Sequence, residues 1–267
     1  MIAVLACAGV GSRLPGATTK ELYRVGDLPM IDYALSAARL AGCDRVLLVV
    51  SPGKEAVANH VAVNWNFKSV QTVYQNHPLG TGHALALAAK VLRCHDSFLY
   101  LMPDTVFDQL SFVRAMSSAP FSSPTVMLWP TDKPTEMGCF LHAKGKVVVH
   151  CEKRQPPWPG PYLAWGAASL PHSFLLLCRE AWKSGKWAKH AVVNRGLDAK
   201  DFTIDDAFDY ALATGMPIEA VEVEGEYHDC GTPARVEAAE AWLKRSDQAK
   251  ARPDALWHAG WLPGGRP

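Results

Sequence analysis

The chain has 267 residues, of which 49% are hydrophobic and 20% charged, as in a folded globular protein with room for one large α/β domain. A formal net charge of +1 gives no reason to expect nucleic acid or an anionic membrane surface as a partner. The 7 cysteines, an odd number without any C-x-x-C spacing, disfavour a zinc site and a disulfide framework. Residues 1–6 are apolar but follow no basic residue and soon reach Arg13, so we expect a cytoplasmic protein without a targeting or membrane-spanning segment.

Strands and helices alternate along the first part of the chain. We expect buried strands at 2–8 and 45–50, further strands at 70–74 and 97–102, and helices at 31–40 and 82–92. This alternation predicts a doubly wound, Rossmann-like α/β sheet. The carboxyl ends of its parallel strands would share one edge, where ligands of such sheets bind.

From about residue 125 the pattern changes to shorter strands separated by turns. Strands at 125–129, 139–142 and 146–151 should run antiparallel, with Ala143-Lys144-Gly145 as a hairpin turn. Further expected elements are helices at 174–182 and 204–213, a strand at 218–223 and a closing helix at 237–243. We therefore predict one domain over 1–244, a mixed sheet with a small antiparallel lobe, followed by a loosely ordered tail over 245–267.

The segment Ala8-Gly9-Val10-Gly11-Ser12-Arg13 follows the first strand directly. Glycines allow backbone N–H groups to approach phosphate oxygens, and Arg13 and Lys20 could neutralise a triphosphate. For so short a motif, a plain turn with surface cations is an alternative of about equal weight. Neither a third glycine at dinucleotide spacing nor a G-K-[ST] ending is present, which disfavours NAD binding and ATP hydrolysis.

This opening also resembles a known family. Leu5-Ala6-Cys7-Ala8-Gly9-Val10-Gly11-Ser12-Arg13-Leu14, then Lys20 and Leu28-Pro29-Met30-Ile31, is similar to the signature L-A-A-G-x-G-[ST]-R-[LM] of nucleotidyltransferases. Cys7 replaces the usual alanine. The sugar-phosphate, isoprenoid-precursor and molybdenum-cofactor branches share this opening, so it implies the superfamily alone. The resemblance implies that Ala8, Gly9 and Gly11 bind the nucleotide and that Arg13 and Lys20 are catalytic.

The segment Gln75-Asn76-His77-Pro78-Leu79-Gly80-Thr81-Gly82-His83-Ala84 lies between a predicted strand and a predicted helix. An amide side chain can pair with a pyrimidine edge, whereas the alternative is a turn in which Thr81 caps the helix. The stretch resembles Q-x-x-x-L-G-T-G-H-A of uridylyltransferases acting on hexosamine 1-phosphates. That resemblance implies that Gln75, Gly80 and Thr81 bind the nucleotide.

Two aspartates are candidate ligands of Mg²⁺. Asp104 follows the strand at 97–102, where a carboxylate could hold a hard cation beside phosphates or simply cap a helix. The family carries its magnesium-binding aspartate at this point. Tyr227-His228-Asp229-Cys230-Gly231-Thr232-Pro233 resembles the family's W-x-D-[IV]-G-T-P ending, which implies Asp229 as the second metal ligand.

Three short pieces resemble the family's acceptor-binding series Y-G-x-[VI], G-x-[VI] and E-K: Glu136-Met137-Gly138-Cys139, Gly145-Lys146-Val147 and Glu152-Lys153. The resemblance implies that Gly138, Glu152 and, in the later Ala164-Trp165-Gly166, Gly166 bind a sugar. It also implies that Lys153 holds the sugar phosphate as a catalytic residue. Met137 and Ala168 stand where the family usually has tyrosine, which predicts an atypical acceptor.

The resemblance spans about residues 3 to 242 and is strongest to glucose-1-phosphate thymidylyl- and uridylyltransferases and to the hexosamine enzymes. It implies a Mg²⁺-dependent transferase that joins UTP or dTTP to a sugar 1-phosphate and releases pyrophosphate. Two alternatives stay open: a cytidylyl- or guanylyltransferase with a non-sugar phosphate acceptor, and a non-catalytic nucleotide-binding regulatory subunit. The identity of the sugar and association into homo-oligomers are left open by the sequence.

Overall fold

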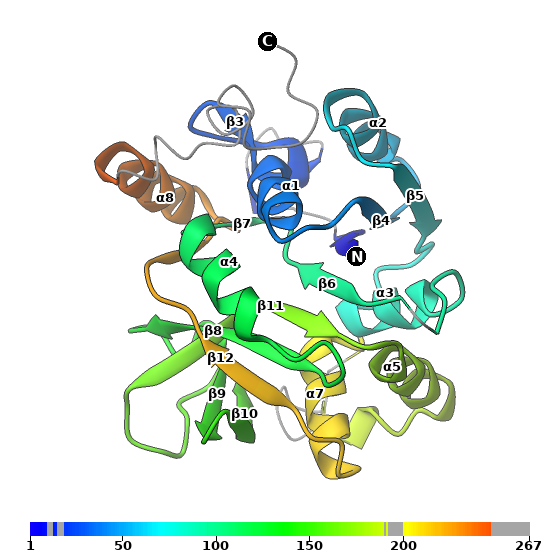
Figure 1. Cartoon of the computed structure of the whole chain (residues 1–267), viewed down its shortest axis with the longest axis vertical. Coiled ribbons are helices and arrows are strands. Elements are labelled where there is room, and N and C mark those ends of the chain that lie inside the picture. The colour runs from blue at the N-terminus through cyan, green and yellow to red at the C-terminus, as the bar shows by residue number, and fades with distance from the viewer. Residues whose placement is uncertain (10–12, 15–18, 95, 190, 192–199, 247–267) are drawn as a thin grey trace.

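The computed structural model describes residues 1–9, 13–14, 19–94, 96–189, 191 and 200–246 (Figure 1). No helix in this described part of the chain is long and apolar enough to cross a membrane. Gly11 and the residues of the predicted tail from 247 onward lie outside the described residues. The division at residue 244 therefore stays a prediction.

Nine strands form one mixed sheet in the order β5-β4-β1-β6-β11-β8-β12-β10-β9. Their bounds are β1 Ile2–Cys7, β4 Arg45–Val50, β5 Ser69–Tyr74, β6 Phe98–Leu101, β8 Thr125–Thr131, β9 Gly138–Ala143, β10 Lys146–Glu152, β11 Tyr162–Leu170 and β12 Glu219–Glu222. Strands β5, β4, β1 and β6 are parallel, whereas β11 runs antiparallel to β6 and β8. The predicted α/β fold with a mixed sheet is confirmed.

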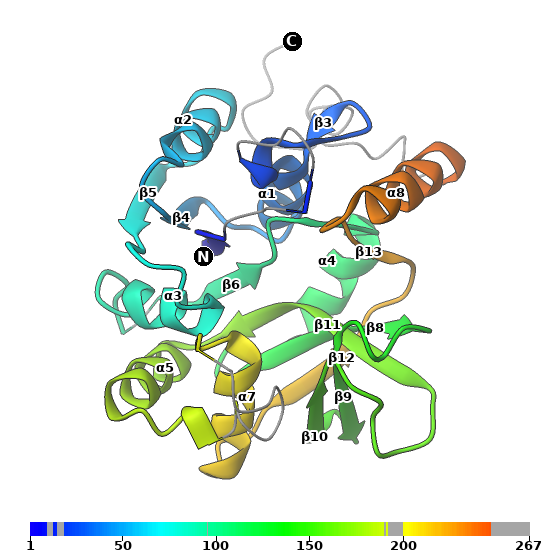
Figure 2. The same cartoon turned by 180° about the vertical axis from the view of Figure 1, so that it is seen from behind.

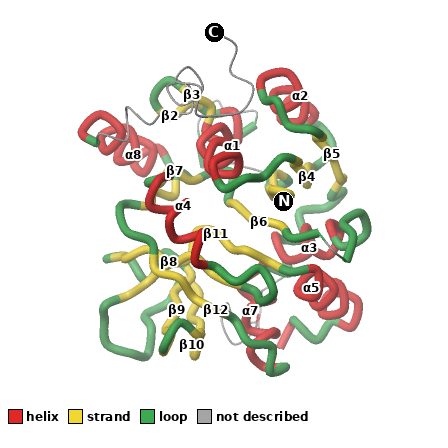
Figure 3. Tube along the Cα trace, viewed as in Figure 1, coloured by secondary structure: helices red, strands yellow, loops and turns green. Residues whose placement is uncertain are grey.

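Helices cover both faces of this sheet (Figures 1 and 3). They are α1 Met30–Leu40, α2 Glu55–Asn64, α3 Thr81–Ala88, α4 Gln109–Ser118, α5 His172–Ser184 and α7 Ile204–Ala213, while α8 Pro233–Arg245 lies away from the sheet faces. One apolar cluster joins the sheet to α1, α2 and α4, and a second joins it to α3, α5 and α7. Along β6, Phe98 and Tyr100 enter the second cluster while Leu99 and Leu101 enter the first, as expected for a strand buried on both faces. Figure 2 shows the molecule from the side of α7.

The antiparallel lobe contains the predicted hairpin. Strands β9 and β10 pair from Ala143 opposite Lys146, so only Lys144 and Gly145 form the connection. Both residues have positive φ, 53° and 76°, as a type I′ hairpin turn requires. The lobe continues the main sheet, because β9 also pairs with β11.

Smaller pairings complete the fold. Strand β7 Thr105–Phe107 pairs antiparallel with β13 Tyr227–Asp229, and β2 Arg24–Val25 pairs with β3 Leu28–Pro29 after the short 3-10 helix η1 Lys20–Leu22. Helix α8 packs on these pieces through a third apolar cluster. The closing helix begins earlier than predicted, at Pro233, because proline fits the first turn of a helix.

Candidate functional site

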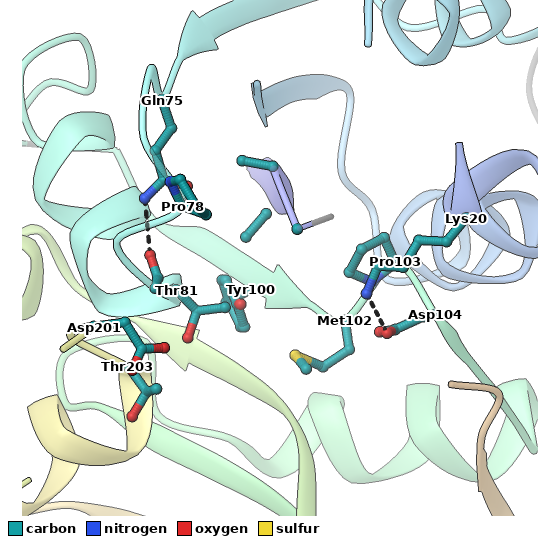
Figure 4. A pocket seen from close by; sticks show the side chains of 14 residues that line it. Lys20, Gln75, Pro78, Thr81, Tyr100, Met102, Pro103, Asp104, Asp201 and Thr203 are labelled. Carbon is teal, nitrogen blue, oxygen red and sulfur yellow. Dashed lines mark hydrogen bonds and ion pairs between the residues drawn. The ribbon is translucent and has the colours of Figure 1, made fainter. Parts of the chain in front are cut away.

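A cavity of about 260 Å³ opens at the carboxyl ends of the parallel strands (Figure 4). It is lined by these residues predicted from the sequence: Ala8, Gly9, Lys20, Gln75, Gly80, Thr81 and Asp104. They come from the segments after β1, β5 and β6, which are neighbouring strands of the sheet or one strand apart. The fold thus brings together groups that lie far apart in the sequence, and we call this cavity the edge cavity.

Gln75 lies at one side of the edge cavity and is only 3% exposed. Its amide nitrogen donates to the carbonyl of Gly80 at 3.0 Å and lies 2.8 Å from His83 Nδ1. Burial lowers the pKa of His83, which favours the neutral ring that accepts this hydrogen bond. With both amide hydrogens directed to the protein, the side-chain oxygen of Gln75 is the atom suited to accept from a ligand.

Gly80 is required by close packing at the start of α3. Its φ is +90°, and a Cβ at this position would lie 2.3 Å from the carbonyl oxygen of Phe202. The hydroxyl of Thr81 accepts from the N–H of Ile204 at 2.9 Å. Gly80 and Thr81 therefore also join α3 to the segment that begins α7, whatever they contribute to ligand binding.

Lys20 and Asp104 form an ion pair at the other side of the edge cavity from Gln75. The distance from Lys20 Nζ to Asp104 Oδ2 is 2.6 Å. Burial alone would lower the pKa of Lys20, but the charge and hydrogen bond of Asp104 outweigh it and raise this pKa. Lys20 is therefore a protonated cation held in a fixed place.

Asp229 lies close to Asp104 because β13 pairs with β7. The N–H of Cys230 donates to the Asp104 carbonyl at 2.9 Å. Burial raises the pKa of the Asp229 carboxyl, and the charge of Asp104 raises it further, while Arg235 acts in the opposite direction. Two carboxylates that repel each other in this way suit a divalent cation with oxygen ligands. No group of three or more possible metal ligands occurs among the described residues, so other ligands of Mg²⁺ would be substrate or water.

Arg13 lies beside Asp229, outside the lining of the edge cavity. One of its guanidinium nitrogens is 3.2 Å from the place a Cβ on Gly231 would occupy. Its charge, like that of Arg235, opposes the rise in the pKa of Asp229 that burial and Asp104 cause. The two predicted cations, Arg13 and Lys20, thus each lie beside one of the two predicted metal ligands.

A second cavity, of about 420 Å³, is lined by Asp229, by the connection from β8 to β9 and by helix α8. Arg235 of α8 forms ion pairs with both Asp229 and Glu136, a residue of that connection. Met137, which replaces the usual tyrosine of the family, also lines this cavity. The second cavity therefore connects Asp229 with the antiparallel lobe.

The predicted acceptor residues do not converge on these cavities. Glu152 is 2% exposed and Lys153 has a φ of +47° and a side chain 64% exposed; the described lining of the two cavities includes neither. A Cβ on Gly138 would lie 2.4 Å from Asp205 Oδ1, and one on Gly166 would lie 2.1 Å from the Tyr227 ring. Both glycines are thus needed for close packing, Gly138 at the start of β9 and Gly166 within β11.

Two buried charge clusters were not predicted from the sequence. Lys54 and Glu21 pair directly behind the end of β1. His150 lies between Asp205 and Asp209, and Trp165 donates to Asp205. The burial of Lys54 could not be predicted from the sequence, because a lysine after Ser51-Pro52-Gly53 is typical of an exposed turn.

The fold is that of a doubly wound α/β protein, and the edge cavity lies at the carboxyl edge of the strands, where proteins of this class bind ligands. A sequence model described as nucleotidyl transferase matches residues 2–245. The chain therefore belongs to the nucleotidyl transferase family, which confirms the resemblance found in the sequence.

Individual relatives agree with this assignment. The bifunctional protein GlmU of Xanthobacter autotrophicus is 28% identical over 249 residues, which cover 90% of this chain and 52% of that protein. GlmU of Paraburkholderia phymatum is 25% identical over 258 residues, covering 95% of this chain and 53% of that protein. The chain thus spans about half the length of these relatives.

Solved structures show the same fold. A UDP-glucose pyrophosphorylase complexed with UDP-glucose matches with a TM-score of 0.73 and 19% identity, covering 92% of this chain and 99% of that one. A putative glucose-1-phosphate thymidylyltransferase from Bacillus anthracis matches with a TM-score of 0.70 and 19% identity. The match covers 92% of this chain and 97% of that one. An inositol-1-phosphate CTP transferase from T. maritima gives a TM-score of 0.69 at 19% identity, covering 92% and 96%.

Proposed function

We propose that the protein is a Mg²⁺-dependent nucleotidyltransferase that joins UTP or dTTP to a sugar 1-phosphate. The observation that carries the proposal is the Lys20–Asp104 pair, which faces Gln75 across the edge cavity. One side of the cavity thereby offers a hydrogen-bond acceptor for a base, and the other offers a cation and a carboxylate for phosphates and their metal ion. Family membership supports the same chemistry.

Gln75 supports a pyrimidine base with an N–H donor on its pairing edge. Since the Gln75 amide nitrogen is held by Gly80 and His83, its oxygen is left to accept from the ring N–H of uracil or thymine. The exocyclic amine of cytosine is also a donor, so CTP belongs in the same test. Gly80 lets the backbone of the cavity lining beside Gln75 pack closely against the backbone of Phe202.

The reaction needs alignment and charge neutralisation more than it needs a base. An acceptor phosphate oxygen forms a bond to the α-phosphorus as the bond to the β-phosphate oxygen breaks, and pyrophosphate leaves. Lys20 would bind the α- and β-phosphates and Arg13 the leaving pyrophosphate, which spreads the developing negative charge. Lys153, which is not part of the described lining of either cavity, would hold the acceptor phosphate on the ground of the family resemblance alone.

Asp104 and Asp229 would hold the Mg²⁺. The ion, when bound, neutralises phosphate charge and helps to hold the substrates in line. Burial raises the pKa of Asp229 and the charge of Asp104 raises it further, so a bound cation would favour the ionised carboxylate. Chelation with EDTA should therefore abolish turnover, and added Mg²⁺ should restore it.

The acceptor class rests on the relatives. One structural neighbour is a putative thymidylyltransferase of glucose 1-phosphate, and another was solved with UDP-glucose. Met137, which lines the second cavity where the family usually has tyrosine, supports an acceptor that differs from the common hexoses. The inositol-1-phosphate CTP transferase supports a non-sugar acceptor as the second candidate.

A pyrophosphate-release assay tests these proposals. UTP, dTTP, CTP, ATP and GTP are each combined with glucose 1-phosphate, hexosamine 1-phosphates, inositol 1-phosphate and phosphocholine. We expect the highest kcat/KM with UTP or dTTP and a sugar 1-phosphate. Preference for CTP with a non-sugar phosphate would favour the second candidate, and nucleotide binding without turnover would indicate a regulatory subunit.

A further inference from the structure

Lys54, which directly precedes helix α2, has a buried side chain whose ammonium group reaches the end of β1. Its Nζ donates to the carbonyl oxygen of Cys7 at 3.0 Å and to that of Gly9 at 2.5 Å. Cys7 is the last residue of β1, and Gly9 lines the edge cavity. Lys54, which lies in the connection between β4 and α2, thus hydrogen-bonds to the backbone that forms one wall of the edge cavity.

The same ammonium group binds Glu21. The two carboxylate oxygens of Glu21 lie 2.9 and 2.8 Å from Lys54 Nζ, and Glu21 is fully buried. Burial raises the pKa of Glu21, and the charge of Lys54 acts in the opposite direction. Glu21 is the neighbour of Lys20 in η1, so this contact also fixes the turn that presents Lys20 to Asp104.

An ammonium group has three N–H donors, and Lys54 directs them at two backbone carbonyls and one carboxylate. No donor is left over for a ligand, so Lys54 acts through other residues. Because a trans peptide bond points its N–H opposite to its carbonyl, holding the Cys7 carbonyl directs the Ala8 N–H away from Lys54. Ala8 is itself part of the cavity lining.

We propose that Lys54 is a positioning residue for the nucleoside triphosphate, holding the backbone after β1 and the turn that carries Lys20 in one arrangement. The inference rests on the proposed function, since it takes the edge cavity as the triphosphate site. A lysine that only stabilised the fold would change the free energy of unfolding and leave substrate recognition unaltered. A positioning lysine changes the KM of the triphosphate and leaves that of the acceptor nearly constant.

The double variant Lys54→Met/Glu21→Gln separates these roles, because it removes both buried charges together and avoids leaving one of them unpaired. We expect the KM for UTP or dTTP and the Kd for the same nucleotide to rise about 10-fold or more, as small misplacements of binding groups do. The KM of the acceptor should stay within about threefold, since its proposed contacts lie elsewhere. Glu21→Gln alone keeps both carbonyl contacts and should raise the triphosphate KM by less than about threefold.

Lys68→Met is the matched control, because Lys68 has a side chain 77% exposed and pairs only at the surface with Asp44, 2.8 Å away. It should leave both KM values unchanged. Equal rises in both KM values, or wild-type KM and Kd values in a double variant of lowered melting temperature, would overturn the proposal. Binding of UTP or dTTP by the wild type without any turnover contradicts the proposed function alone, since the Kd comparison still tests Lys54. A wild type that binds neither nucleotide contradicts both.

Discussion

Lys20 and Asp104 neutralise each other's charge in an ion pair, on the side of the edge cavity opposite Gln75. Their side chains are 19% and 11% exposed, so each charge is only partly solvated and is held by its partner. Asp229 adds a second carboxylate, whose pKa is raised by burial and, to a lesser degree, by the charge of Asp104. A triphosphate with its cation would satisfy all three groups at once, which is why we place the chemistry here.

Lys20→Met and Asp104→Asn should each lower kcat/KM by about 100-fold or more, the usual loss when one group that stabilises transition-state charge is removed. Pyrophosphate release at saturating Mg²⁺ measures the effect, and far-ultraviolet circular dichroism confirms that the variants fold. The neutral double variant Lys20→Met/Asp104→Asn should fold as well as the wild type and remain inactive. Single variants with rates close to that of the wild type would contradict the assignment.

Site residues that belong to a recognisable sequence motif could be predicted from the sequence. Residues that come into contact only when the chain folds could not. Gln75 and Asp104 follow predicted strands directly, and the edge cavity does contain both. Lys54 and Glu21 lie in unremarkable local sequence, and only the packing of the β4–α2 connection against η1 brings their charges together. Pairing across such a distance in the chain has no local signal.

Among the elements, β1, β4 and β6 were predictable because continuous apolar runs ended by glycine or proline mark them. Strand β11 was missed although it lies between β6 and β8 in the sheet. Its pairing shifts between Trp165 and Ala167, and the glycine between them weakens the strand pattern. Gly166 has a physical reason to be there, since the ring of Tyr227 occupies the space of a side chain.

The start of α3 offers a prediction at the same scale. Gly80→Ala introduces a Cβ that meets the Phe202 carbonyl at 2.3 Å and places alanine at a φ of +90°. Gly42→Ala is the matched control, because Gly42 has a φ of +84° and a Cβ added there would meet no atom within 4 Å. Strain alone should cost about 1–3 kcal/mol in both variants. Only Gly80→Ala should lose more stability in urea unfolding and also raise the KM of the triphosphate.

Equal destabilisation of the two alanine variants, with nucleotide KM values unchanged, would mean that the wall formed by Gly80 and Phe202 tolerates displacement. The close approach would then have no part in nucleotide binding. The structure favours the opposite result, because the N–H of Phe202 donates to the carbonyl of Leu79 and its own carbonyl accepts from Gly82. Movement at Gly80 would disturb both hydrogen bonds.

In the described part of the chain, two apolar clusters pack on the faces of one sheet and a third lies under α8. A charged cluster is buried where β10 meets α7. His150 Nδ1 lies 2.9 Å from Asp209 and its Nε2 lies 3.1 Å from Asp205, while Trp165 donates to Asp205 at 2.8 Å. Phe140 stacks obliquely against the His150 ring, with centroids 4.5 Å apart. Because His150 belongs to β10 and both aspartates belong to α7, this cluster joins the antiparallel lobe to α7. The same lobe carries segments proposed to bind the acceptor.

The protonation of His150 makes the stability of the whole chain depend on pH. Burial alone would lower the pKa of His150, but its hydrogen bonds to Asp205 and Asp209 and their charges raise it from 6.5 to about 10. The folded state therefore binds a proton that the unfolded state releases between these two values. This stabilisation is complete below pH 6.5 and is lost as the pH rises through about 10.

Urea unfolding between pH 6.5 and 10 should show a free energy of unfolding that falls by up to about 1.4 kcal/mol per pH unit from this group. Asp209→Asn removes one of the two carboxylates, so it should lower the pKa of His150 and move the loss of stability to lower pH. His142→Gln, on the neighbouring strand and paired with the exposed Glu222, should leave the slope as in the wild type. A wild-type free energy that is constant across this range, or one unaffected by Asp209→Asn, would show that the His150 cluster does not carry the proton that stabilises the folded chain.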